Sequence, residues 1–115
     1  MHELSIAMSV LESLTAEAQR RPGSKFVKVG LRIGELAGID KDALTFCFEA
    51  LVKETEWQSL ALDIESVLRR QRCARCNLTF AVKDYEFACP NCGEQETACA
   101  GGDELDIAYV ELEEA

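Results

Sequence analysis

The sequence has little of what membrane insertion, secretion or histidine-based catalysis requires. No apolar run reaches about 18 residues, so we expect no membrane-spanning helix. The N-terminus lacks a basic segment followed by an apolar core, which predicts a cytoplasmic protein without a signal peptide. His2 is the only histidine, and no GxxxxGKS or GxxxxGKT loop is present, so neither Ser–His or Cys–His catalysis nor nucleotide hydrolysis is supported. We therefore expect that the protein is not an enzyme.

Positive charge is also scarce. The chain carries 12 Lys and Arg against 21 Asp and Glu, which gives a formal net charge of −9. Because so acidic a surface repels phosphate backbones, we expect no nucleic-acid partner. It suits the handling of cations or contact with a basic protein surface. The length of 115 residues and the 48% hydrophobic content fit one small domain carrying a smaller module.

Cysteine, in contrast, is plentiful and regularly spaced. Four of the six cysteines form two Cys-x-x-Cys pairs, Cys73 with Cys76 and Cys89 with Cys92, separated by twelve residues. Two such pairs can place four thiolates at the corners of one tetrahedron, which is the ligand set of structural Zn²⁺. Iron or paired disulfides are the alternatives, but disulfides are rare in the cytoplasm. A module this small cannot bury enough apolar surface, so we expect metal to hold it together.

The remaining cysteines and the basic residues before the first pair have simpler interpretations. Cys47 falls on the apolar face of a predicted helix and is interpreted as a small core residue. Cys99 lies outside the four-ligand pattern and is interpreted as a free thiol. The arginines between Arg69 and Arg75 predict a solvated linker, with a basic docking patch as the alternative.

Hydrophobic periodicity predicts a helix–strand–helix–strand core and one late strand. The first helix precedes Pro22, and its predicted core stripe consists of Leu4, Ala7, Met8, Leu11 and Ala18, with Leu14 beside it. A strand over 26–34 is followed by a helix capped by Asp40, whose apolar face is Leu44, Cys47, Phe48, Leu51 and Val52. Two further strands are predicted. One contains the apolar residues Leu60, Leu62 and Ile64, and the other contains Leu105, Ile107 and Tyr109, with a bulge as an option before Val110 and Leu112.

These elements predict an α+β fold. It consists of a small mixed three-stranded sheet with two helices, interrupted by an inserted zinc-ribbon domain. The predicted boundaries place residues 1–68 and 103–115 in the first domain and residues 69–102 in the ribbon.

The N-terminus carries a second candidate metal site. The α-amine of Met1, the amide nitrogen of His2 and its Nδ1 can close fused five- and six-membered chelate rings in one plane, which favours Ni(II) or Cu(II) over Zn(II). The alternative is that His2 is an accident of a frayed terminus. Glu3 is either part of this site or a first-turn acid favoured by the helix dipole. Asp40 is interpreted as a helix cap rather than a ligand.

Together these motifs resemble the hydrogenase nickel-incorporation protein family, HypA/HybF, over essentially the whole chain. The shared motifs are Met1-His2-Glu3, Ile33-Gly34-Glu35-Leu36, Phe46-Cys47-Phe48-Glu49, the two cysteine pairs and Gly102-Asp103-Glu104-Leu105. The resemblance implies a nickel metallochaperone for the maturation of nickel–iron hydrogenase, with nickel held at His2 and structural zinc in the ribbon. It implies as partners the GTPase HypB and the hydrogenase large-subunit precursor, and in some relatives urease maturation proteins.

Two other functions and the oligomeric state remain open at this point. One alternative is a zinc-ribbon interaction module in transcription with His2 incidental. The other is a rubredoxin-like iron electron carrier, against which the lack of a dense aromatic shell argues. We expect a monomer or a weak homodimer. The sequence lacks the histidines that some relatives carry near the zinc knuckles, so no second imidazole ligand for nickel is apparent.

Overall fold

The computed structural model describes residues 3–113 and divides into two compact units. The first unit contains residues 3–32, 38–65 and 106–113 of the described chain, and the second contains Ile33–Ala37 and Ser66–Leu105. Over this range, no helix has both the length and the apolar content needed to cross a membrane.

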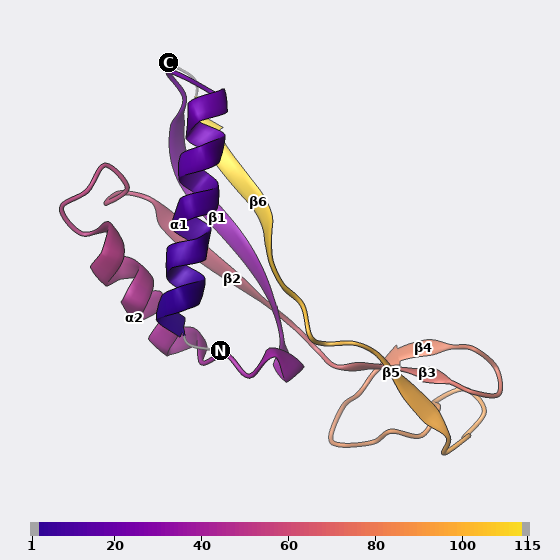
Figure 1. Cartoon of the computed structure of the whole chain (residues 1–115). Helices are drawn as coiled ribbons and strands as arrows, with labels where there is room; N and C mark the ends of the chain where they lie inside the picture. Colours follow the sequence, from indigo (N-terminus) through magenta and orange to yellow (C-terminus); the bar gives the residue numbers. More distant parts are fainter. Residues whose placement is uncertain (1–2, 114–115) are drawn as a thin grey trace. The chain divides into compact units, whose positions relative to one another are not determined.

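The first unit builds two helices on one three-stranded sheet (Figure 1). The sheet has the order β2-β1-β6. The bounds of the elements are α1 Glu3–Arg20, β1 Lys25–Gly34, α2 Lys41–Val52, β2 Ala61–Val67 and β6 Leu105–Glu113. The predicted fold class of two helices on a small sheet with a separate cysteine-rich module is confirmed.

The core of the first unit differs from the predicted stripe on α1. The buried residues of α1 are Ile6, Ala7, Val10 and Leu14. Leu4 and Met8, predicted to be core residues, are 48% and 49% exposed. The prediction was wrong because α1 has apolar residues on two faces, and spacing alone does not tell which face meets the sheet. The predicted apolar face of α2 agrees better with the structure, since Leu44, Phe48 and Val52 are buried. Its other two members, Cys47 and Leu51, are half-buried.

Strand β6 also changes face along its length. Ile107 and Tyr109 were predicted to alternate along one face, with a bulge as an option before Val110 and Leu112. Ile107, Val110 and Leu112 do line one hollow together with Leu14 of α1, but Tyr109 is not part of it. The Tyr109 ring instead covers Gly30, where an added Cβ would lie 2.0 Å from Cε1. Its hydroxyl donates to Asp63 Oδ2 at 2.6 Å. The side chain of Tyr109 therefore spans the width of the sheet, and only glycine fits beneath it.

The second unit contains a separate three-stranded sheet. Its strands β3 Arg70–Cys73, β4 Thr79–Ala81 and β5 Thr97–Gly101 have the order β4-β3-β5, with both pairs antiparallel. The predicted solvated linker is wrong for its first part, because Arg70 lies in the central strand and Gln71 is buried. Arg69 is also engaged, since its guanidinium lies 4.7 Å from the centroid of the Phe87 ring.

A hydrogen-bonded junction closes the base of this unit. The amides of Gly34 and Leu36 donate to the carbonyls of Glu104 and Gly102 at 2.8 and 2.7 Å. The Glu104 carboxylate accepts from the Gly102 amide and pairs with Arg70. A Cβ on Gly34 would lie 2.0 Å from the Gly102 carbonyl oxygen, so these backbones meet only because Gly34 has no side chain.

Candidate metal centres

The four paired cysteines come together in the second unit. The Sγ atoms of Cys73, Cys76, Cys89 and Cys92 all lie within 4.8 Å of one another. The Cys73–Cys92 and Cys76–Cys89 sulfur distances are 3.5 and 3.6 Å. Four sulfurs at about 2.3 Å from one tetrahedral zinc lie roughly 3.8 Å apart. The donor set and its spacing therefore fit one zinc ion.

Each cysteine pair is held in the same backbone turn. In the first turn the Cys73 carbonyl accepts from the Asn77 amide, and the Cys73 amide donates to the Leu78 carbonyl. Asn77 has a positive φ of 63°, a conformation that asparagine adopts more readily than most residues. The second turn repeats all three features at Cys89, Gly93 and Glu94, with Gly93 at a φ of 78°. The two turns therefore present their sulfurs with matching geometry.

Hydrogen-bond donors surround the sulfurs. Cys73 Sγ accepts from the amides of Arg75 and Cys76 at 3.3 and 3.4 Å. The backbone amide of Leu78, helped by the Asn91 side chain, lowers the pKa of Cys76 to about 6. Such bonds favour the thiolate form that binds metal.

The pKa of Cys92 is shifted in the opposite direction. The Glu94 amide acts to lower its pKa, but burial and the neighbouring sulfurs together raise the pKa of Cys92 to about 12. Four adjacent thiols do not all ionise without a cation between them. Metal binding at this cluster must therefore release protons.

Asn91 is a contributor that the sequence analysis did not single out. Its Nδ2 donates to Cys76 Sγ at 3.8 Å, so the second turn supplies a donor to a sulfur of the first. The position between Cys89 and Cys92 was visible in sequence, but the direction of its side chain was not.

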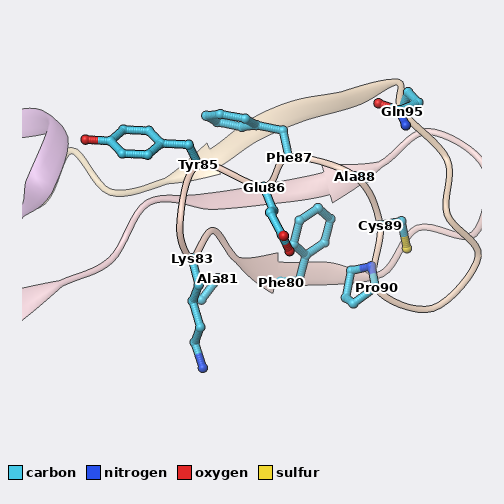
Figure 2. A pocket seen from close by; sticks show the side chains of 10 residues that line it. All are labelled: Phe80, Ala81, Lys83, Tyr85, Glu86, Phe87, Ala88, Cys89, Pro90 and Gln95. Carbon is cyan, nitrogen blue, oxygen red and sulfur yellow. The ribbon is translucent and has the colours of Figure 1, made fainter.

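A hollow of about 660 Å³ adjoins the second turn (Figure 2). In Figure 2 the Phe80 ring and the Glu86 carboxylate point toward one another, whereas the Tyr85 ring extends away. Only Cys89 belongs both to this lining and to the sulfur cluster. The hollow therefore lies beside the cluster and adds no further sulfur or imidazole ligand from the described residues.

The N-terminal candidate site lies partly outside the described residues, because Met1 and His2 precede them. Of its neighbours, Glu3 begins α1, and its Oε2 accepts a hydrogen bond from the Asp40 amide at 3.3 Å. Asp40 Oδ1 accepts from the amides of Asp42 and Ala43, which confirms Asp40 as the cap of α2. The start of α1 is therefore tied to the start of α2 through Glu3.

The two unpaired cysteines lie apart from the sulfur cluster. Cys47 is half-buried on α2, and Cys99 is exposed on β5. Neither contributes to the one group of potential metal-ligating side chains found among residues 3–113.

Known proteins match the chain over nearly its full length. The family described as "Hydrogenase/urease nickel incorporation, metallochaperone, hypA" matches residues 1–112. The hydrogenase maturation factor HypA of Prosthecochloris aestuarii is 36% identical over 98% of this chain and 100% of its own. Those of Geotalea uraniireducens and Geobacter metallireducens are 39% and 38% identical, each with the same coverage.

Solved structures agree with the fold. A solution structure of HypA protein is 25% identical, with a TM-score of 0.71 over 97% of this chain and 96% of that one. The solution structure of the Ni metallochaperone HypA from Helicobacter pylori is 24% identical, with a TM-score of 0.65 over 97% of each chain. The chain belongs to the HypA family of hydrogenase/urease nickel incorporation metallochaperones.

Proposed function

We propose that the protein binds Ni(II) at its N-terminus and delivers it during the maturation of nickel–iron hydrogenase, with a structural zinc site in its second unit. The observation that carries this proposal is the family match, which extends over residues 1–112 and so includes both candidate metal sites. The family description names nickel incorporation, and the chain retains Met1-His2-Glu3 and all four paired cysteines. This role requires no covalent catalysis by the protein.

The proposed nickel ligands are the Met1 α-amine, the His2 amide nitrogen and His2 Nδ1. These three nitrogens can close fused five- and six-membered chelate rings in one plane, an arrangement that suits Ni(II). Glu3 lies beside the site, and its hydrogen bond to the Asp40 amide supports a positioning role rather than direct ligation. The fourth ligand is then Asp40, a partner residue or water. A site built on the chain terminus would let a second protein replace its ligands one at a time.

The proposed zinc site contains Cys73, Cys76, Cys89 and Cys92. When bound, zinc would neutralise part of the thiolate charge and cross-link the two turns. The residues of the chain orient the sulfurs through the amides and the Asn91 side chain described above. A closed set of four thiolates suits a permanent structural ion rather than a transported one.

The proposed partners follow from this role. Nickel would be exchanged with the GTPase HypB and delivered to the hydrogenase large-subunit precursor in the cytoplasm, and urease maturation proteins are further candidates. The proposed nickel domain comprises residues 1–68 and 103–115, and the proposed zinc domain residues 69–102. The compact units differ from these boundaries by a few residues at each end, and Ile33–Ala37 joins the second unit through its bonds to Gly102 and Glu104.

Metal analysis after nickel loading tests the proposal. The wild type is expected to hold one zinc and one nickel, whereas His2→Ala keeps its zinc and loses most of its nickel. Added nickel is expected to bind without expelling zinc, because the two donor sets prefer different ions. Release of one zinc for each nickel bound would contradict the assignment of two separate sites.

A further inference from the structure

Helix α1 has an outer face that is apolar but not buried. Leu4 and Met8 lie one turn apart and are about half exposed, at 48% and 49%. Met8 continues into a hollow of about 420 Å³, lined by Met8, Leu11, Glu12, Thr15, Ala16 and Gln19. We name this surface, from Leu4 to Gln19, the α1 outer face.

The α1 outer face is almost free of charge. Glu12 is the only charged residue among the exposed positions of α1 from Leu4 to Gln19, which are Leu4, Ser5, Met8, Ser9, Glu12, Ser13, Thr15, Ala16 and Gln19. In a chain that is 29% charged, the solvent side of a surface helix normally carries many charges. On α2, three of the five exposed positions are charged, namely Lys41, Asp42 and Glu49. Depletion of charge together with exposed methionine is typical of the centre of a protein–protein interface.

The polar residues of this face do not make it strongly hydrophilic. The Thr15 hydroxyl donates to the Leu11 carbonyl at 2.8 Å within the helix, so its methyl group remains available for outside contact. Ala16 is small, which allows the surface of another protein to approach the helix closely. The face can therefore bury apolar area without leaving charged groups unpaired.

The position of the face indicates what it binds. Leu4 directly follows Glu3, and Met8 lies about 6 Å further along the helix axis. Because Leu4 is only two positions along the chain from His2, a protein seated here is within reach of the proposed nickel ligands. Because a second copy would also carry a net charge of −9, long-range repulsion disfavours self-association. A different protein with an apolar contact surface and a basic rim, able to meet Glu12, is complementary.

We propose that the α1 outer face docks the protein that accepts nickel from the N-terminus, through an apolar contact surface with a basic rim. This inference rests on the proposed function for the identity of the partner as a nickel acceptor. Docking at this face brings the acceptor's own ligands to the terminus while the nickel is still bound, so the ion need not pass through free solution.

The test compares two substitutions that add the same charge to different helices. Met8→Glu places an acid in the centre of the α1 outer face, and Ala50→Glu places one at an exposed position of α2. The probe is the purified precursor of a nickel–iron hydrogenase large subunit, and its affinity for the full-length, zinc-loaded chain is measured by calorimetry with and without one equivalent of nickel. Met8→Glu is expected to weaken binding at least about tenfold, whereas Ala50→Glu leaves it within about twofold.

Further measurements distinguish a loss of docking from a loss of folding or of nickel binding. Circular dichroism and zinc content check folding, and Met8→Ser, which adds no charge, is expected to weaken binding by a smaller factor. Unchanged nickel affinity in Met8→Glu with lost docking supports the inference. Docking equal to wild type in Met8→Glu overturns the inference, whether or not the wild type binds nickel. A wild-type dimer that Met8→Glu dissociates in sedimentation would show a second copy on this face and would also overturn it.

The same measurements distinguish a failure of the proposed nickel site from a failure of the proposed docking surface. If the wild type binds the precursor through this face but takes up no nickel, the nickel site is wrong and the docking surface stands. If nickel binds at the terminus and docking is insensitive to Met8→Glu, the nickel site stands and the docking surface is wrong.

Discussion

The two candidate metal sites assemble their donor atoms in opposite ways. The sulfur cluster joins two turns that are twelve residues apart, each with its own backbone hydrogen bonds. The proposed nickel donors belong to adjacent residues, Met1 and His2, and need only a free terminus. The sulfur cluster therefore depends on folding and contributes to it. The proposed nickel site depends only on two residues that are adjacent in the sequence and on a free α-amine. A site that depends on folding suits an ion that stays bound, and a site at the terminus suits an ion that is passed on.

The largest expected effect concerns the folding dependence of the sulfur cluster. Cys73→Ser removes a fully buried ligand, and the second unit is expected to lose zinc and ordered structure, while the first unit keeps its helices. Structural zinc contributes about 10–16 kcal/mol of apparent binding free energy in zinc-finger peptides. The measurement is zinc content together with amide NMR spectra.

Cys99→Ser is the matched control, because Cys99 is exposed and lies outside the cluster. It is expected to retain zinc and an unchanged spectrum. Loss of zinc in Cys99→Ser, or its retention in Cys73→Ser, would show that the ligands have been assigned wrongly.

The second prediction separates the buried and outer faces of α1. Leu14 is 1% exposed, so Leu14→Ala should lower the free energy of unfolding of the first unit by about 2–5 kcal/mol. Met8→Ala, on the exposed face, should cost much less. Urea denaturation followed by helix dichroism measures both, with zinc content expected to stay at wild-type level. Equal destabilisation by the two changes would contradict the burial described for α1.

The third prediction distinguishes positioning from ligation at Glu3. Glu3→Gln keeps a carbonyl oxygen that can accept from the Asp40 amide, whereas Glu3→Ala does not. Nickel affinity is expected to be nearly unchanged in Glu3→Gln and weaker in Glu3→Ala. Asp40→Ala should also cost about 0.5–2 kcal/mol through loss of the α2 cap. If Glu3→Gln lowers nickel affinity as strongly as Glu3→Ala, then the Glu3 carboxylate is itself a ligand.

The smallest expected effect concerns the hydrogen bond from Tyr109 to Asp63 across the sheet of the first unit. The hydrogen bond to Asp63 raises the pKa of Tyr109 to about 12. A raised pKa of a neutral acid contributes stability that is complete below the ordinary tyrosine value of about 10 and is lost as the pH rises through the folded value. The phenolate absorbance of wild type minus Tyr109→Phe isolates this titration. In Asp63→Asn the titration should move to lower pH, and no movement would show that Asp63 is not the cause.

The sequence predicted those features that depend on local spacing. The four clustered cysteines, the Asp40 cap and the buried face of α2 all follow from residue types at fixed intervals. The buried face of α1 and the orientation of Tyr109 could not be predicted in this way, because both depend on which neighbouring element covers them. Leu4 and Met8 have the same spacing as a core stripe, and only the packed structure shows that Ile6 and Val10 face inward instead.

The same limit applies to the base of the second unit. Arg70 resembles a solvated linker residue in sequence, but its partner Glu104 is 34 positions away. The junction of Gly34 with Gly102 likewise depends on a long-range approach of two backbones. Gly34-Glu35-Leu36 and Gly102-Asp103-Glu104 were visible as motifs, whereas their mutual contact required the fold.

The central claim is that nickel is held by the terminus itself, including the Met1 α-amine. Nickel titration by calorimetry on three forms tests it most directly: the native chain, the chain acetylated at its α-amine, and a chain extended by one residue before Met1, with circular dichroism and zinc content as controls. Acetylation and extension are expected to weaken nickel binding as much as His2→Ala does, while folding and zinc remain unchanged. Equal nickel affinity in all three forms would contradict the claim, because the α-amine would then not be a ligand.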